Sequence, residues 1–510
     1  MPDRFRQAIW NEPLLSELSR DGRAAYSLPS IPREILAKTG DPLKLIPSSM
    51  ERRGDLDLPE LSEPQVLRHY VRLSQMNFAI DLGMYPLGSC TMKYNPKVSQ
   101  RIARNPKIAN LHPYQDEDTI QGILSILFEL EQMLCEIAGM HSFSVQPAAG
   151  AQGEYVGALI MKDFLVDQGH PEKDEILVPD SAHGTNPASA AMAGFKVVKI
   201  PSAKGGIVTV DEVKPLVSNR TAGMMLTVPN TLGIFEREIE QVTALVHKNG
   251  GLMYYDGANM NAMLGRVRPG DMGFDIVHIN VHKTFATPHG GGGPGAGPVG
   301  VTAALEQYLP VPRIIRAEKD SKFHLDYARP KSIGPIKSFY GNSAVLLRAY
   351  CYILSLGRDG LRLASEQAVL ASNYLLSLLD KESYSRAGLE EIPAKHEFVV
   401  TSSLLKKKTG ITAGEVAKAI LDKGMHSPTT YFPLIVNEAL MIEPTETETL
   451  ENLEEYALVL NTIAKNASIK HDDISSSPHN TSIGRLDEAR ASHPNTMVLN
   501  WKEIQRTQEQ

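Results

Sequence analysis

The chain has 510 residues, of which 42% are hydrophobic, and a formal net charge of -7 at pH 7. A chain of this length has room for two or three domains with a sizeable packed core. Because its basic and acidic residues are well mixed, it carries no electrostatic footprint for a nucleic acid or an anionic membrane, and we expect neither as a partner.

The three cysteines, Cys90, Cys135 and Cys351, are too few and too scattered for a disulfide framework or a cysteine-rich metal site. The opening residues have neither the apolar core of a signal peptide nor the Arg- and Ser-rich composition of a transit peptide. No run approaches the roughly 18 apolar residues of a membrane helix. We therefore expect a cytoplasmic protein.

Residues 1–95 are predicted to form an amino-terminal arm with helices. Prolines and acidic stretches such as GDLDLPELSEP interrupt its first part, which cannot build a core of its own and should wrap a neighbouring surface. The pattern of residues 64–78 is helical. The segment 85–102, YPLGSCTMKYNPKVSQRI, is predicted to be a loop because glycine, serine and proline break its periodicity.

Apolar residues recur at spacings of three and four over residues 119–138, which predicts an amphipathic helix of about five turns. The glycine-rich stretch PAAGAQGEY follows and leads into a second predicted helix, 154–166. Ala149, Gly150 and Ala151 therefore lie at a helix N-terminus, where free N–H groups and the helix dipole favour a phosphate.

Strand and helix patterns alternate through the region 96–320, which we expect to be a large domain. The predicted strands are 175–179, 195–201, 223–229, 251–258 and 275–282, with helices at NPASAAMAG, 210–217 and 239–248 between them. This βαβ alternation predicts an α/β fold with a mainly parallel sheet and helices on both faces. Ligands of such sheets bind at the carboxyl ends of the strands, where His183, Asp256 and Lys283 are expected.

The remaining chain is predicted to hold a smaller α+β domain over 330–465 and a polar docking tail over 466–510. A connector interrupted by proline and glycine, 313–343, precedes the small domain. The secondary structure predicted for that domain comprises helices at 344–356, 361–379 and AGEVAKAILDK and strands at EFVVTS and ALMIEP.

Lys283 stands between a predicted strand and the run GGGGPGAGPVG. A lysine amine in such a place can form a Schiff base with a carbonyl cofactor. An average lysine extends its amine into solvent instead. Here the strand end and the glycine-rich loop favour the chemical role.

Two further strand ends carry polar groups suited to a planar cofactor. Asp256 can pair with a protonated pyridine nitrogen and keep that nitrogen charged, although the sequence DGAN also favours a simple turn. His183 can lie over the face of a ring, with Asn186 and Ser189 offering polar contacts at the start of the next helix. Asn186 followed by proline is equally a plain helix start.

His278, His282 and His289 must be weighed as metal ligands, since the first two are four residues apart. The segment lacks the glutamate of an HExxH site and a nearby acid, so we expect no metal. The glycine run lacks the order of a nucleotide-binding loop. Its expected use is to let a ligand or partner approach the backbone closely, with Gly292 as the test position.

Together these segments resemble the glycine-decarboxylating P-proteins of the glycine cleavage system, specifically the second subunit of the two-subunit type. The stretches that carry the resemblance are EPQVLRHYVRLSQMNF, YPLGSCTMKYNP, LHPYQ, QPAAGAQGEY, SAHGTNPASA, YYDGANMNA, HKTFATPHGGGGPGAGPVG, SIGPIKSFYGN, MHSPTTYFP, MIEPTETE and SPHNTSIGRLDEARASHP. They run from about residue 60 to about residue 500.

The resemblance implies a fold-type-I enzyme dependent on pyridoxal 5'-phosphate, with an aspartate-aminotransferase-like large domain built on a mainly parallel seven-stranded sheet. It implies a cofactor aldimine on Lys283, Asp256 at the pyridine nitrogen and His183 on the ring. The cofactor-binding set implied is Lys283, Asp256, His183, Ala149, Gly150, Ala151, Asn186, Ser189 and His282. Cys90 and His112 are expected near the active site.

The implied reaction is the decarboxylation of glycine, with transfer of the aminomethyl group to the lipoyl arm of H-protein. The implied partners are P-protein subunit 1, with two copies of each subunit, and lipoylated H-protein. Another pyridoxal-phosphate reaction at glycine or a small amino acid, such as aminotransfer or aldol cleavage, is an alternative that would need no H-protein. A purely structural or regulatory subunit is a second, which the presence of Lys283 and Asp256 opposes.

Overall fold

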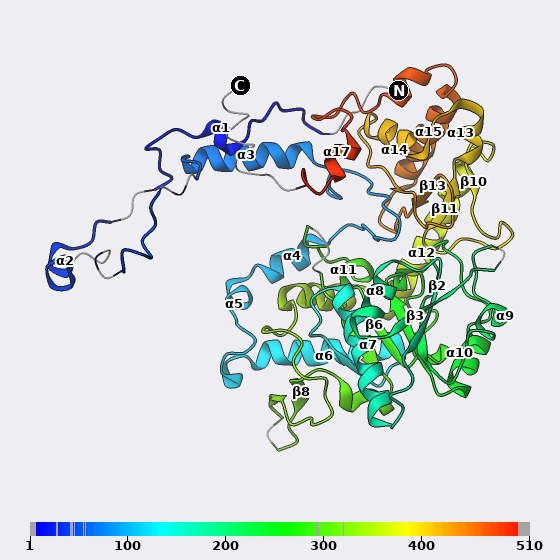
Figure 1. The fold of residues 1–510 in the computed structure, drawn as a ribbon, viewed down its shortest axis with the longest axis horizontal. Helices are drawn as coiled ribbons and strands as arrows, with labels where there is room; N and C mark the ends of the chain where they lie inside the picture. The colour runs from blue at the N-terminus through cyan, green and yellow to red at the C-terminus, as the bar shows by residue number, and fades with distance from the viewer. Residues whose placement is uncertain are drawn as a thin grey trace. The chain divides into compact units, whose positions relative to one another are not determined.

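The structure is a computed structural model that describes residues 7–26, 29–40, 44, 46–54, 56, 58–203, 205–291, 295–319 and 321–497. The chain divides into two compact units (Figure 1). The first comprises Met1–Phe78, Asp422–Gly424 and Ser477–Gln510, and the second comprises Ala79–Leu421 and Met425–Ser476. Of the described helices, none is long and apolar enough to cross a membrane.

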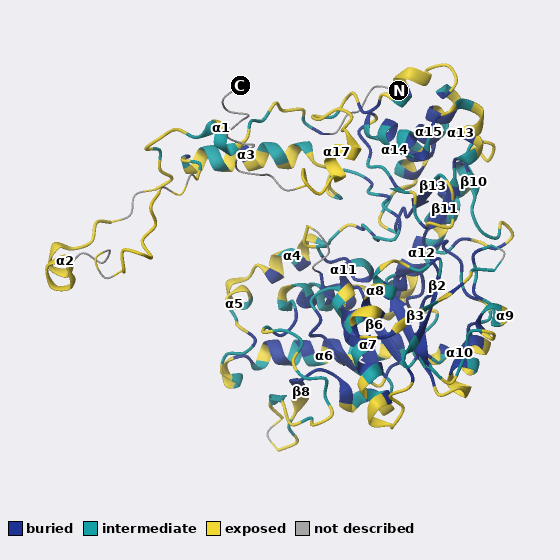
Figure 2. Cartoon of the chain, in the orientation of Figure 1, coloured by how far each residue is buried: buried dark blue, intermediate teal, exposed yellow. Residues whose placement is uncertain are grey.

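The first unit is built around one amphipathic helix, α3. Its helices are α1 (Leu15–Leu18), α2 (Arg33–Thr39), α3 (Glu63–Met76) and α17 (Glu488–Ser492). The Glu12 carboxylate ties the segment before α1 to α3, since it lies 2.9 Å from His69 Nδ1 and accepts a hydrogen bond from Arg72 at 3.0 Å. No residue of α2 is buried (Figure 2).

The second unit contains the predicted seven-stranded, mainly parallel sheet, which is confirmed. Its strand order is β1-β7-β6-β5-β4-β2-β3, and only β7 runs antiparallel to its neighbours. The strands are β1 (Ser142–Ser144), β2 (Glu175–Pro179), β3 (Lys196–Ile200), β4 (Thr221–Thr227), β5 (Leu252–Gly257), β6 (Ile276–Ile279) and β7 (Val299–Val301).

The α-helices of this unit pack against the large sheet and against a smaller sheet, described below. They are α4 (Lys97–Ala103), α5 (Pro106–Ala109), α6 (Gln121–Ala138), α7 (Gly150–Asp167), α8 (Thr185–Met192), α9 (Val210–Val213), α10 (Ile239–Lys248), α11 (Val281–Thr284), α12 (Ser343–Leu378), α13 (Ser403–Thr409), α14 (Ala413–Leu421), α15 (Leu450–Asn466) and α16 (His471–Ser475). Short 3-10 helices are η2 (Glu117–Thr119), η3 (Met260–Ala262), η4 (Pro269–Met272) and η5 (Ala303–Tyr308).

Alternation along the central strands gives the large sheet two apolar faces. In β5, Met253 and Tyr255 join the core cluster formed with α6, α10 and α12, whereas Tyr254 joins the cluster formed with α7 and α8. Successive side chains of a strand point to opposite faces, so a strand buried on both sides must be apolar throughout. Asp256, which follows Tyr255, therefore lies on the α7 face.

The segment around Lys283 corrects one prediction. The strand predicted for 275–282 ends at Ile279, and Lys283 lies in the single helical turn α11. The carbonyl of Asn280 accepts the N–H groups of Lys283 at 2.9 Å and Thr284 at 3.0 Å. A strand cannot make these hydrogen bonds within itself. The chain therefore leaves the strand at Asn280 and forms a helical turn, which keeps Lys283 near the edge of the sheet.

Two helix boundaries also differ from the predictions. The helix predicted from residue 119 begins at Gln121, and the one predicted from residue 154 begins at Gly150. The glycine-rich stretch is therefore the first turn of α7 rather than a loop before it. The helices predicted at 344–356 and 361–379 are joined in α12, which contains a non-helical break at Gly357.

The smaller sheet is antiparallel, with the order β10-β11-β13-β12. Its strands are β10 (Ser385–Arg386), β11 (Phe398–Thr401), β12 (Thr429–Thr430) and β13 (Ala439–Ile442). The predicted connector 313–343 contains a two-stranded hairpin of β8 (Arg313–Arg316) and β9 (Phe323–Asp326). The hairpin was not predicted, because proline and glycine interrupt the strand pattern of this segment.

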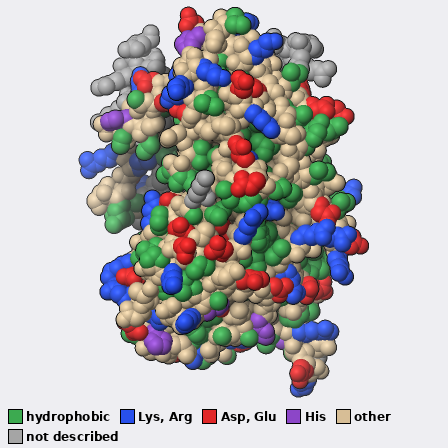
Figure 3. All heavy atoms as spheres, turned by 90° about the vertical axis from the view of Figure 1, so that its right-hand side faces the viewer, with side chains coloured by type: hydrophobic (Ala, Val, Ile, Leu, Met, Phe, Trp, Pro, Cys, Tyr) green, Lys and Arg blue, Asp and Glu red, His purple; other side chains and the backbone are tan. Residues whose placement is uncertain are grey.

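On the face drawn in Figure 3, acidic and basic side chains are interspersed.

Candidate active site

A cavity of about 490 Å³ opens at the carboxyl edge of the large sheet. Three residues at neighbouring strand ends line this cavity: Thr227 at the end of β4, Asp256 in β5 and Asn280 just after β6. Its lining includes these predicted site residues: Ala149, Gly150, Ala151, His183, Asp256, His282 and Lys283. The strand ends thus converge where a parallel sheet places a ligand.

Asp256 is the buried anchor of this cavity, with only 2% of the residue exposed. Its Oδ2 accepts hydrogen bonds from Asn186 Nδ2 at 2.9 Å and Thr227 Oγ1 at 3.0 Å, and its Oδ1 accepts the Ala258 N–H at 2.9 Å. Burial raises the pKa of Asp256, but His278, these hydrogen bonds and Lys283 outweigh it and leave the pKa below its ordinary value. The group is therefore an anion at neutral pH.

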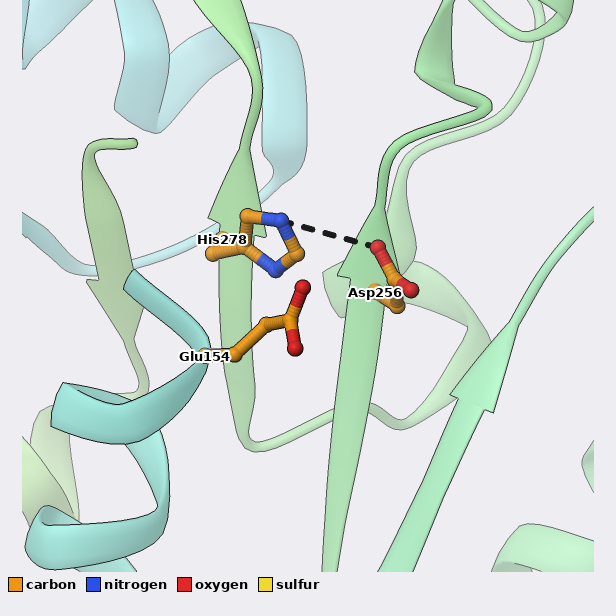
Figure 4. Close-up of side chains that lie close together, drawn as sticks. All are labelled: Glu154, Asp256 and His278. Carbon is orange, nitrogen blue, oxygen red and sulfur yellow. Dashed lines mark ion pairs between the residues drawn. The ribbon is translucent and has the colours of Figure 1, made fainter. Parts of the chain in front are cut away.

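Glu154 and His278 lie beside Asp256 on the α7 face of the sheet (Figure 4). His278 Nε2 is 3.5 Å from Asp256 Oδ1, and Glu154 accepts a hydrogen bond from Thr185 Oγ1 at 3.0 Å. Burial, together with the charge of Asp256, raises the pKa of Glu154 to about 8. Glu154 is thus a protonated acid next to an ionised one, an arrangement that lets two buried carboxyl groups coexist.

Lys283 projects from α11 into the cavity, where its Nζ donates a hydrogen bond to the Ser89 carbonyl at 2.8 Å. Ser89 lies in the segment that was predicted to be a loop, next to Cys90. The structure therefore brings Cys90 close to Lys283, whereas His112 packs against Phe339.

The N-terminus of α7 forms another wall of the cavity. Ala149 is its N-cap, and Gly150 and Ala151 lie in its first turn. The N–H groups of these two residues have no acceptor within the helix. A Cβ atom on Gly150 would collide with the Asn280 side chain, and one on Gly297 would collide with the Ala149 carbonyl. Glycine at both positions lets the chain close around this helix end.

His183 lines the cavity, while Asn186 and Ser189 lie behind it. His183 Nδ1 is 2.8 Å from Thr185 Oγ1, and its ring meets Phe432 edge-on at 5.8 Å. Asn186 is buried against Asp256, and Ser189 donates a hydrogen bond to Glu154 at 3.4 Å. Their side chains thus support the two acids.

His282 is buried in the cavity wall with its Nδ1 donating to the Ala296 carbonyl at 3.3 Å. Burial, His289 and Lys283 lower the pKa of His282 to about 3, so the ring is neutral. Its Nδ1 proton is fixed by the carbonyl, which leaves Nε2 as an acceptor. Within the described residues, two groups of acids and histidines have metal-like spacing. One contains His278 with Glu154 and Asp256, so the expectation that no acid lies near His278 was wrong, and neither group contains His282 or His289.

The described glycines of the run differ in burial. Gly295, Gly297 and Gly300 are buried, in close contact with the His282 side chain, the Ala149 carbonyl and the Phe143 side chain respectively. Gly290 and Gly291 are exposed, so the approach of a ligand or partner to this run stays a prediction. Gly292 lies outside the described residues.

Sequence reasoning missed Glu154, Ser89, Thr227 and Asn280. Glu154 stands one turn into a helix that begins at the glycine-rich stretch, a position from which an acid can face a ligand at the helix end. The sequence around the other three residues does not mark them as site residues, because their place in the cavity depends on residues that are distant along the chain.

Replacing Glu154 by glutamine is expected to change how stability depends on pH. The raised pKa means that the folded state holds a proton between the ordinary pKa of 4.5 and about 8 that the unfolded state releases. Stability from this group is therefore full below pH 4.5 and is lost as the pH rises through about 8. Removing the group should flatten that loss, by at most about 1.4 kcal/mol per pH unit.

Thermal midpoints of the cofactor-free chain between pH 5 and pH 9 check this, with Asp256, His278 and Lys283 unchanged in both proteins. Glu240→Gln, at an exposed acid on α10, is the matched control and should follow the wild type. Parallel curves for wild type and Glu154→Gln would show that the buried acid is ionised in the folded state.

Two family models match the chain. One, described as "Glycine cleavage system P-protein", covers residues 31–328, and the other, "Glycine dehydrogenase, C-terminal domain", covers residues 364–482. A "Probable glycine dehydrogenase (decarboxylating) subunit 2" of Pyrococcus furiosus is 55% identical over 98% of this chain and 97% of that protein. One of the same name from Caldanaerobacter subterraneus is 51% identical over 96% and 98%.

Solved structures with the same fold include a glycine decarboxylase (P-protein) of the glycine cleavage system in inhibitor-bound form. It aligns with a TM-score of 0.71 at 22% identity, covering 84% of this chain and 97% of that one. A glutamate decarboxylase of Lactobacillus brevis aligns with a TM-score of 0.63 at 13% identity, covering 84% and 98%. At these identities the alignments establish the fold alone.

Proposed function

The chain belongs to the glycine cleavage system P-protein family, and we propose that it decarboxylates glycine with pyridoxal 5'-phosphate and passes the aminomethyl group to the lipoyl arm of a carrier, H-protein. The observation that carries this proposal is the convergence of Lys283, ionised Asp256 and the N-terminus of α7 on one cavity. An amine, an anion and an anion-binding helix end are the three groups that this cofactor's aldehyde, ring nitrogen and phosphate require.

The residues present fit the cofactor. The buried Asn186 Oδ1 has no hydrogen-bond partner among the described residues, so the network around Asp256 still has polar capacity at the cavity. Gly150 and Gly297 let the chain pack closely around the N-terminus of α7, where a phosphate would bind. Ala149, Gly150 and Ala151 would hold the phosphate, and Lys283 the aldehyde carbon.

When bound, pyridoxal 5'-phosphate supplies an electron-accepting ring that draws electrons from the bond to the departing carboxylate of glycine. Asp256 supports this chemistry by holding a proton at the ring nitrogen, because its charge is fixed by Asn186, Thr227 and the Ala258 N–H. A preorganised buried anion needs no rearrangement as charge develops.

The other cavity residues orient and protect the reacting atoms. His183 would cover one face of the ring and exclude water, and neutral His282 would accept a hydrogen bond through Nε2. Lys283 would hold the cofactor through its Nζ and, when free of it, would move a proton at that atom. Glu154, kept protonated by its surroundings, leaves Asp256 as the single negative charge of the pair.

Relatives named "subunit 2" imply a second polypeptide, and we propose that this chain works with P-protein subunit 1, two copies of each forming the enzyme. Lipoylated H-protein would accept the aminomethyl group at a lipoyl sulfur, reducing the lipoyl disulfide. The requirement for H-protein separates this function from aminotransfer or aldol cleavage at the same cofactor.

The testing experiment is the exchange of labelled carbon dioxide into the carboxylate of glycine. It is run with the chain alone, with subunit 1 added, and with lipoylated H-protein added to both. We expect exchange in the complete mixture and loss of exchange when H-protein is left out. No exchange in the complete mixture would rule out decarboxylation, and exchange independent of H-protein would show decarboxylation without transfer to that carrier.

A further inference from the structure

The turn that receives the amine of Lys283 is held in a strained conformation. Ser89 has φ 66° and Thr91 has φ 40°, a backbone region that residues other than glycine rarely adopt. Such a conformation costs free energy and persists only where the surrounding structure imposes it. The residues that impose it should therefore be identifiable by their contacts with this turn.

Two buried glutamates next to strands of the smaller sheet accept hydrogen bonds from the two strained residues. Glu397, just before β11, accepts the Ser89 N–H at 2.7 Å through Oε2. Glu443, just after β13, accepts the Thr91 N–H at 2.9 Å through Oε2. Both side chains are fully buried, so water does not compete for these hydrogen bonds.

The rest of the turn is attached to the same sheet. The Gly88 N–H donates to the Met441 carbonyl at 3.2 Å, and the Gly88 carbonyl accepts from Thr429 Oγ1 at 2.8 Å. A Cβ atom on Gly88 would collide with Met441, so the turn can approach β13 only with glycine there. The direction of the Ser89 carbonyl is thus set by the smaller sheet.

That carbonyl is the acceptor of Lys283 Nζ at 2.8 Å. Ser89 therefore relays the contact: its N–H points to Glu397 and its carbonyl points to the lysine. The Ser89 carbonyl is held in place because the Ser89 N–H is bound to Glu397 and the preceding Gly88 carbonyl is bound to Thr429. A fixed acceptor gives the amine of Lys283 one defined position when it is not bonded to cofactor. A mobile side chain with a four-carbon stem has no such position by itself.

Burial shifts both glutamates toward their protonated forms. It raises the pKa of Glu397 above its ordinary range and that of Glu443 to about 7. Glu443 also raises the pKa of Glu397, and Glu446 raises that of Glu443, while Lys283 lowers both. Burial, Lys283 and Lys93 lower the pKa of His396 to about 3, so His396 adds no charge.

The same three residues have the spacing of a metal site, with ligand atoms of His396, Glu397 and Glu443 within 4.8 Å of one another. His396 Nε2 is 3.8 Å from Glu443 Oε1, and neither atom has a hydrogen-bond partner within the described residues. The Oε2 atoms of both glutamates already accept backbone N–H groups, and Lys283 lies close enough to lower the pKa of both. These contacts explain the cluster with the chain's own groups, without a metal ion.

We propose that Glu397 and Glu443 are positioning residues for Lys283: by holding the Ser89–Thr91 turn they place the Ser89 carbonyl as the docking point of the free lysine amine. This inference rests on the proposed function, because it assigns a use to the position of Lys283 between its bonds to cofactor. Neither glutamate needs to touch glycine or the cofactor.

The experiment uses the full chain without cofactor and measures how fast acetic anhydride acetylates Lys283, by mass spectrometry of its peptide. Glu397→Ala and Glu443→Ala release the turn, and we expect acetylation about tenfold faster because a buried hydrogen bond that holds the turn is lost. Glu397→Gln and Glu443→Gln keep an oxygen for the N–H and should stay within about twofold of wild type. Rescue by glutamine separates the hydrogen bond from the charge.

Glu236→Ala is the matched control for general loosening. Glu236 is a buried acid that accepts the Val208 N–H at 2.9 Å and a hydrogen bond from Asn230, and it makes no hydrogen bond to the turn. It should lower the thermal midpoint without changing acetylation of Lys283. Should an alanine variant not fold, Thr429→Val gives a second measure, because it removes only the hydroxyl that donates to the Gly88 carbonyl of the turn, and acetylation should rise.

Three results would overturn the proposal. They are unchanged acetylation in the alanine variants, an equal rise in Glu236→Ala, or a stoichiometric metal ion in the wild type that Glu443→Gln loses. Capture of pyridoxal 5'-phosphate by Lys283, fixed with borohydride, is measured in parallel. If the wild type captures none, the proposed function fails; if it captures cofactor and the alanine variants behave like wild type, the positioning role alone fails.

Discussion

Lys283→Ala is expected to lower the rate of carbon dioxide release from glycine by about 10³-fold or more, because the amine both attaches the cofactor and moves a proton. The measurement is the turnover number in the complete mixture with subunit 1 and lipoylated H-protein. Borohydride reduction should leave no cofactor mass on the peptide that contains position 283.

Lys283→Arg refines this test. Arginine keeps a positive charge and a donor for the Ser89 carbonyl but cannot form a Schiff base, so it should be as inactive as alanine. Lys199→Ala, at an exposed lysine on β3, is the matched control and should leave turnover unchanged. Activity of the arginine variant within tenfold of wild type, or cofactor captured on another lysine, would remove Lys283 from the chemistry.

Asp256→Asn is expected to lower turnover by about 10²–10³-fold while leaving cofactor capture at Lys283 intact. Asparagine has nearly the same shape and retains a carbonyl oxygen for Asn186, Thr227 or the Ala258 N–H, so the fold should persist. What is lost is the negative charge that keeps a proton at the ring nitrogen. Turnover at saturating glycine measures the effect.

The control for the charge is Asp275→Asn. Asp275 also accepts a backbone N–H, that of Met253 at 2.7 Å, and pairs with His247, but it lies at the opposite end of the strands. Its replacement should affect stability more than turnover. If Asp256→Asn kept turnover within tenfold of wild type, or lost cofactor capture instead, the assigned role of the carboxylate would be wrong.

The sheet and its helices could be predicted because their signals are local. Apolar strands buried on both faces alternate with amphipathic helices, and this pattern depends on residues close in the chain. The three-residue strands β1 and β7 were missed because so short a run has no measurable period. Residues 275–282 were predicted as one strand because the apolar alternation continues past Ile279, where Asn280 in fact starts a helical turn.

The site was predictable to the extent that strand ends and a helix start identify it. Lys283, Asp256 and Gly150 each follow from such a position, and the structure brings them to one cavity, while their roles stay predictions. Glu154 and Glu397 could not be found this way. An acid in a sequence is read as solvated unless its burial is known, and burial depends on elements distant along the chain.

The glutamates that hold the Ser89–Thr91 turn have a consequence for how the protein is made. Ser89 and Glu397 are 308 positions apart, and Thr91 and Glu443 are 352 apart. Domains begin to fold as the chain emerges from the ribosome, amino-terminal part first. The large sheet can therefore assemble while the turn beside Lys283 still lacks both of its acceptors, so a prematurely terminated chain would contain the lysine without the support that positions it.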